Sequence, residues 1–83
     1  MAVSLLQVGD HLSLEFDVSD LGAVRDCIRE THPEVTTQPA GIATRVCFGG
    51  EQFTFQNEWD DPCLISGSSK GDDLLRDIHA HLG

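Results

Sequence analysis

Basic side chains are scarce in this chain of 83 residues, which sets five Lys or Arg against fourteen Asp or Glu for a formal net charge of −9. Nucleic-acid binding draws its affinity from clustered cations that displace counterions from phosphates, and binding to anionic lipid needs the same clusters. The sequence therefore predicts neither a nucleic-acid partner nor a membrane partner. The negative surplus favours solubility, and it also suits a basic protein partner.

Cysteine is also sparse, with three residues at positions 27, 47 and 63 and no C-x-x-C spacing. An odd count without paired spacing is a poor disulfide framework, so a reduced, cytoplasmic setting is expected. The first ten residues lack the basic segment of an export signal, and no apolar run approaches the roughly 20 residues that cross a bilayer.

Diagnostic catalytic and metal-binding motifs are absent from the sequence. It contains no G-x-S-x-G turn and no P-loop spacing, and His79 and His81 would point about 200° apart on a helix, so they cannot chelate one ion together. Asp72 and Asp73 after the GSSKG loop would repel a phosphate there and suit helix capping instead. No cofactor and no metal are predicted, and the absence of these motifs disfavours an enzyme without excluding one.

Alternating apolar and polar residues predict a strand from His11 to Val18 with one buried face. A two-residue loop at Gly9–Asp10 would pair it with residues 2–8, setting Leu5 opposite Leu14. For the first eight residues a short helix is the alternative.

The period then changes to that of a helix from Ser19 to His32, where Pro33 ends it. Ser19 is expected to cap this helix. Gly22 in its interior predicts a close approach to the sheet. The stripe that is expected to face the core comprises Leu21, Val24, Cys27, Ile28 and Thr31, with Arg25, Asp26, Arg29 and Glu30 on the opposite side.

Residues 34–38 read as a short strand, Pro39 to Gly41 as a turn, and residues 42–48 and 51–59 as a hairpin around Gly49–Gly50. This register pairs Val46 with Phe53. The apolar face would then be lined by Ile42, Val46, Phe48, Phe53 and Phe55.

A last strand follows Pro62, and a helix closes the chain with Leu74, Leu75, Ile78 and Leu82 on its apolar stripe. Ser69 and Asp72 have the spacing of a capping box, and Asp72 is placed to pair with Arg76. Residues 1–83 thus form a single α+β domain. We expect a two-layer sandwich of four to six mainly antiparallel strands with two helices on one face, in the order (β)-β-α-β-β-β-β-α.

The stretch QNEWDDPC, residues 56–63, concentrates carboxylates around the single Trp. Trp59 continues the apolar face, so it can close the end of the core while Asp60, Asp61 and Pro62 make a turn. Alternatively, Glu58, Asp60 and Asp61 rim an aromatic contact point for a basic partner.

Two functional hypotheses follow from these patterns. The first is a small protein-interaction module, of the inhibitor or immunity type, that contacts a basic partner through Glu58, Trp59, Asp60, Asp61, Arg45 and Gln56. The second is a small-ligand or enzymatic site on the polar sheet face, with Arg45 as anion holder and Cys47 as candidate nucleophile beside Gln52 and Gln56. Pairing of that face with a second copy is a further possibility.

Overall fold

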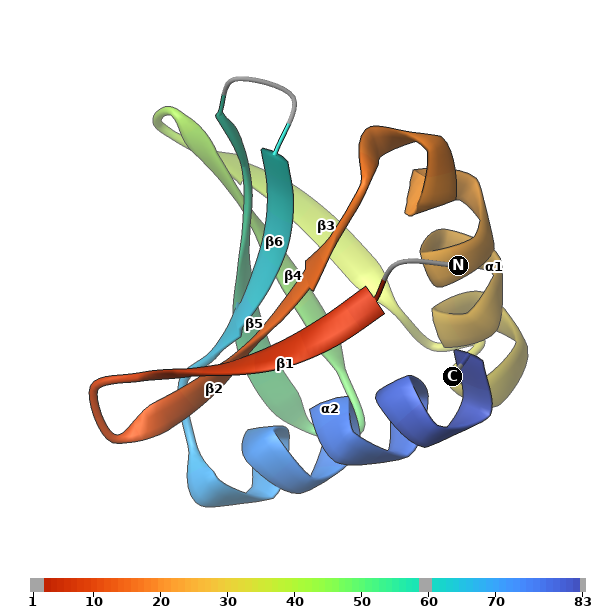
Figure 1. The fold of residues 1–83 in the computed structure, drawn as a ribbon. Coiled ribbons are helices and arrows are strands. Elements are labelled where there is room, and N and C mark those ends of the chain that lie inside the picture. The colour runs from red at the N-terminus through yellow and green to blue at the C-terminus, as the bar shows by residue number, and fades with distance from the viewer. Residues whose placement is uncertain (1–2, 59–60, 83) are drawn as a thin grey trace.

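A computed structural model describes residues 3–58 and 61–82, and the side chain of Glu58 lies outside the description. The elements, coloured along the chain in Figure 1, are β1 (Val3–Val8), β2 (His11–Phe16), a 3₁₀ turn η1 (Val18–Asp20), α1 (Leu21–Thr31), β3 (Thr36–Ala40), β4 (Ala43–Phe48), β5 (Glu51–Glu58), β6 (Asp61–Ser66) and α2 (Ser69–Leu82). The predicted order of elements and the α+β class are confirmed, and residues 3–8 form a strand.

The six strands make one antiparallel sheet in the order β1-β2-β6-β5-β4-β3. Both predicted hairpin registers are confirmed: Leu5 lies opposite Leu14, and Val46 lies opposite Phe53. The two-residue turns fix these registers, since a shift of one residue would move every apolar side chain to the wrong face.

One face of the sheet carries the core and both helices pack on that side (Figure 1). The alternation of apolar and polar residues assigns these inward positions, as the sequence predicts. We call the opposite side of the sheet the outer face. The buried apolar residues come from the four inner strands and both helices: Leu12, Leu14, Phe16, Val24, Cys27, Ile28, Val46, Phe48, Phe53, Leu64, Leu75 and Ile78.

The β3–β4 hairpin differs from the prediction. β3 continues through Pro39 to Ala40, and the turn falls at Gly41, whose φ of 69° suits glycine, and Ile42. Ile42 is therefore at the hairpin tip and 96% exposed, so its predicted place on the apolar face is wrong. Pro39 is tolerated because β3 is an edge strand.

The last strand is also longer than predicted, because β6 begins at Asp61 rather than after Pro62. Asp61 lies opposite Glu58, and Pro62 is buried opposite Asn57. The pairing of β6 with β2 runs only over residues 63–65, so Pro62 precedes the stretch that has neighbours on both sides. The predicted turn at Asp61 and Pro62 is therefore part of a strand.

The N-terminal ends of the two helices differ from the prediction in three local details. η1 delays the first helix, so Asp20 and not Ser19 is its N-cap residue. At α2 the capping hydroxyl belongs to Ser68, which accepts a hydrogen bond from the Gly71 N–H at 2.9 Å. Arg76 pairs with Asp73 at 2.6 Å rather than with Asp72.

Candidate ligand-binding site

The first turn of α2 is held directly against the sheet. The Asp72 carboxylate accepts a hydrogen bond from the backbone N–H of Leu12 at 2.9 Å, and it lies 3.3 Å from Nδ1 of His11. A Cβ on Gly71 would lie 2.5 Å from the Ser66 Oγ and 3.3 Å from the Phe53 ring. The helix can approach this closely only because residue 71 has no side chain.

The carboxylate of Asp72 is kept ionised in this position. Burial by itself would raise its pKa, but the Leu12 amide, the Ser66 hydroxyl and the His11 imidazole outweigh that effect and lower it. Asp72 is 8% exposed and yet has its hydrogen-bond partners, so it ties the start of α2 to β2 without an unsatisfied buried charge.

By contrast, α1 makes its main contacts with η1 and α2 instead of with the strands. Gly22 illustrates the looser fit, because a Cβ there would meet only an atom of Arg25, at 3.9 Å. The prediction that Gly22 permits a close approach to the sheet is therefore wrong. The helix is held by its buried stripe, in which Val24, Cys27 and Ile28 are confirmed, while Thr31 is exposed.

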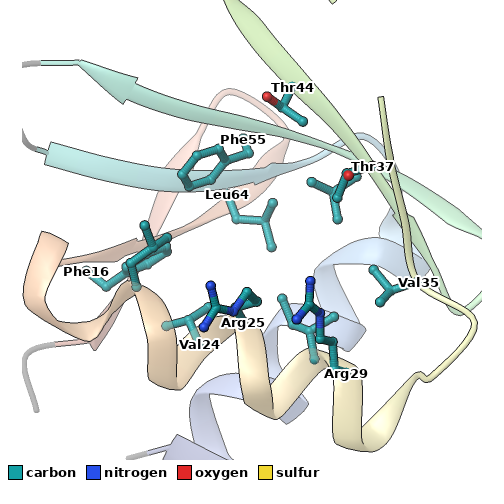
Figure 2. A pocket seen from close by; sticks show the side chains of 12 residues that line it. Phe16, Val24, Arg25, Arg29, Val35, Thr37, Thr44, Phe55 and Leu64 are labelled. Carbon is teal, nitrogen blue, oxygen red and sulfur yellow. The ribbon is translucent and has the colours of Figure 1, made fainter. Parts of the chain in front are cut away.

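A cavity of about 230 Å³ remains between α1 and the core face of the sheet (Figure 2). Its lining draws on α1, on the segments beside it and on strands β2 to β6. Eight of the twelve lining residues are apolar: Phe16, Leu21, Val24, Ile28, Val35, Val46, Phe55 and Leu64. The four polar lining residues are Thr37 and Thr44 on the sheet and Arg25 and Arg29 on α1.

Three apolar side chains show that the packing of this region is incomplete. Leu21, Val35 and Phe55 contact the core cluster but are only half-buried, and all three line the cavity. The cavity is partly open to solvent, since its lining residues Arg25, Arg29 and Thr37 are exposed, and part of its apolar wall is therefore not covered by protein. Apolar side chains at its wall would gain contacts from any apolar molecule that entered it.

Two of the five basic residues of the chain stand at this cavity. Arg25 and Arg29 are one helical turn apart on α1, and Figure 2 shows their guanidinium groups extending from the helix towards the strands. Arg25 Nε lies 3.6 Å from the neighbouring Asp26, and both side chains are largely exposed. Among the residues that the structure describes, no carboxylate forms an ion pair with Arg29.

The residues of the first functional hypothesis belong to a different surface. By register, Arg45, Gln56 and Asp61 share the outer face, while the cavity lies on the core face. Arg45 and Asp61 are exposed and Gln56 is half-buried. Trp59 and Asp60 lie outside the described residues.

The three cysteines are free thiols. Burial, with the Glu30 charge second, raises the pKa of Cys27, and burial with the nearby Glu15 charge raises the pKa of Cys63. Both groups are thereby held as the less nucleophilic thiol. Cys47 is half-buried on the outer face, and its cross-strand neighbours are Thr36 and Gln52.

No group of three or more His, Cys, Asp or Glu side chains converges as a metal site within residues 3–58 and 61–82. In the same part of the chain, neither helix combines the length and the apolar character that a membrane span requires.

Sequence reasoning assigned Arg25 and Arg29 to the solvent side of α1 and missed their position beside the cavity. Both side chains are indeed exposed, but they flank the buried stripe on the side that faces the opening. The signal that could have found them is the i, i+4 repetition of arginine in a chain with so few cations, because like charges at this spacing destabilise a helix slightly.

Comparison of the chain with protein-family models, with curated proteins and with solved structures finds no match in any of the three.

Proposed function

We propose that this protein binds a small apolar molecule in the cavity between α1 and the sheet. The observation that carries the proposal is the cavity itself, because it is lined mainly by apolar side chains and is bordered by a few polar groups. This combination is typical of small-molecule sites. Water at the apolar wall finds few hydrogen-bond partners, so its displacement by an apolar molecule would be favourable.

The size of the cavity limits the ligand. An apolar cavity of about 150 Å³ can hold benzene, so by proportion 230 Å³ accepts about nine carbon atoms. Drug-sized ligands need roughly 300 Å³ or more. The ligand class is therefore a short alkyl chain or a single substituted ring, and a long lipid chain would not fit inside.

A titration with n-propylbenzene tests the proposal. We expect saturable shifts in the methyl NMR resonances of Val24, Val46 and Leu64, which all line the cavity. A Thr44→Phe variant places a ring at the cavity wall and should abolish the binding. The matched control is Thr54→Phe, because Thr54 lies on the neighbouring strand and on the outer face, opposite Arg45.

The proposal fails if these methyl resonances do not shift with propylbenzene in the wild-type protein. It also fails if Thr44→Phe, shown to be folded by its amide spectrum, binds as well as Thr54→Phe does. Circular dichroism and thermal unfolding of both variants separate loss of binding from loss of structure.

We also propose, as a second candidate function, that the outer face binds a basic protein. Two features support it: the described helices leave this face uncovered, and it carries the exposed apolar side chains Leu6 and Val8 beside polar and acidic ones. Asp61 and the half-buried Glu15 supply negative charge on the same side of the sheet. Complementary charge chiefly accelerates and orients such an association.

Affinity capture from native lysate tests this second function. A basic partner should be retained by the wild-type protein at low salt, released at high salt, and lost with the double substitution Asp60→Asn and Asp61→Asn. Capture that is insensitive both to salt and to the double substitution would contradict a charge-driven interaction. If the Thr44→Phe variant still retains the basic partner, the two functions use separate surfaces.

A further inference from the structure

The polar side of the cavity points to the chemical class of its ligand. The chain has only five basic residues, and two of them, Arg25 and Arg29, line this one cavity. Residues four apart on a helix have their Cβ atoms about 5–6 Å apart. Two guanidinium groups that start from such positions can reach the same small anion.

Arg25 and Arg29 are both exposed, and like charges at i, i+4 repel each other slightly. An anion held between the two guanidinium groups would relieve that repulsion. Arg25 has only the adjacent, exposed Asp26 at 3.6 Å, and none of the described carboxylates pairs with Arg29. Of the neighbouring carboxylates on α1, Asp26 points away from the buried stripe, and Glu30 lies on the other flank of that stripe, where its charge helps to raise the pKa of Cys27.

The cavity and the arginine pair together define an amphipathic ligand. The apolar wall suits a body of about nine carbon atoms. Guanidinium groups bind carboxylates by paired, charge-assisted hydrogen bonds, and the apolar stems of the arginines can cover the body of the ligand. The hydroxyl groups of Thr37 and Thr44, on the sheet side of the same cavity, are further donors.

We infer that the ligand is a small amphipathic carboxylate, with its apolar part under α1 and its carboxylate on Arg25 and Arg29. This inference rests on the proposed ligand-binding function and adds the anionic head group to it. Locally, the two positive charges oppose the repulsion that the net charge of −9 exerts on an anion.

Calorimetric titration with octanoate and 1-octanol at pH 7 tests the inference, because the two probes share their chain and differ in charge. We expect octanoate to bind the wild-type protein about tenfold more tightly than octanol, as a charge-assisted contact that is partly screened by solvent allows. In the double variant Arg25→Gln and Arg29→Gln, octanoate affinity should fall about tenfold while octanol affinity stays unchanged. High salt should weaken octanoate and leave octanol unaffected.

The matched control is the double variant Arg45→Gln and Arg76→Gln. It changes the net charge by the same amount but leaves the cavity intact, since Arg45 is on the outer face and Arg76 pairs with Asp73 on the surface. Octanoate should bind this control as it binds the wild type. A loss of affinity equal to that of the Arg25 and Arg29 variant would overturn the inference.

The outcomes separate the inference from the function on which it rests. Equal affinity for octanoate and octanol in the wild type refutes the anionic head group and supports the apolar site. If neither probe binds, the proposed ligand-binding function is refuted and the inference with it. Amide spectra of both double variants establish that they remain folded.

Discussion

The two helices cover the same face of one sheet but meet it in different ways. α2 is in close contact with the strands at Gly71, and Asp72 connects it to β2 by a hydrogen bond. α1 makes its main contacts with α2 and η1, and a cavity separates it from the strands. Their amphipathic patterns are alike, because each helix carries its buried apolar residues on one stripe. An apolar stripe therefore predicts which side of a helix faces the sheet, but it does not predict how closely the helix packs against the sheet.

The surroundings of Gly71 in α2 and Gly22 in α1 illustrate this difference in packing. A methyl group at residue 71 would collide with the Ser66 hydroxyl, but at residue 22 it would make only an ordinary van der Waals contact with Arg25. The start of α2 therefore packs closely on the sheet and is hydrogen-bonded to β2 through Asp72. The looser α1 forms one wall of the cavity. The expected consequences can be measured by changing matched residues in the two helices.

The largest expected losses of stability come from Ile78→Ala in α2 and Ile28→Ala in α1. Both side chains are buried, at 3% and 7% exposure, but Ile28 borders the existing cavity and loses fewer contacts when truncated. We expect Ile78→Ala to lower the free energy of unfolding by about 4 kcal/mol and Ile28→Ala by about 2 kcal/mol. Urea unfolding measures both, and a larger loss at Ile28 would contradict the contrast.

A second contrast compares Gly71→Ala with Gly22→Ala. The methyl group that the first substitution adds must displace Ser66 or the Phe53 ring, so we expect a destabilisation of about 2 kcal/mol. At residue 22 alanine meets no obstacle and has the higher helix propensity, so a stabilisation of about 0.5 kcal/mol is expected. Guanidinium unfolding of the two variants would refute the account if their effects had the same sign.

A third contrast concerns the adjacent carboxylates Asp72 and Asp73. Asp72→Ala leaves the buried Leu12 N–H without its partner and should cost about 2 kcal/mol at pH 7. Asp73 forms an exposed pair with Arg76, so Asp73→Ala should cost about 0.5 kcal/mol or less. Urea unfolding of the two variants at pH 7 measures this difference, and equal losses would contradict it.

The pH dependence of the free energy of unfolding tests whether Asp72 stabilises the fold through its negative charge. Because the folded-state pKa of Asp72 lies below its unfolded value of about 3.9, its stabilisation is complete above that value and is lost as the pH falls through the folded pKa. The wild type should therefore lose more stability than Asp72→Ala between about pH 5 and about pH 2. Parallel unfolding curves for the two proteins over this range would argue against an ionised Asp72.

The smallest contrast lies in native-state hydrogen exchange. Amides of α1 should exchange faster than those of α2, because α1 has fewer contacts with the sheet to break during local opening. A saturating ligand in the cavity should slow exchange in α1 more than in α2. Equal protection of both helices without ligand would count against a loosely packed α1.

Much of this fold follows from the sequence because its hairpin turns and its alternation of residues agree. Gly49–Gly50 and Gly9–Asp10 each fix a register in which apolar residues meet on one face. The sequence predicts the wrong positions for Ile42 and Pro62, because the residue at which a strand ends depends on the pairing with the adjacent strand. That pairing is a tertiary property. Local pattern alone cannot supply it.

The cavity could not be predicted in the same way, because a void depends on the distance between elements. Val24, Ile28 and Phe55 are recognisable as core residues, but no local feature states that the space between them is unfilled. Arg25 and Arg29 were identified only as polar residues of α1. Their repetition in a chain with few cations is the part of the site that the sequence does contain.

The most direct test of the whole account is a crystal structure of the protein with 8-bromooctanoate, whose bromine is located by anomalous scattering. We expect a single bromine peak between α1 and the strands, beside Phe55 and Leu64, and carboxylate density within hydrogen-bond distance of Arg25 and Arg29. An empty cavity with bromine elsewhere, for example beside Arg45 on the outer face, would contradict the account.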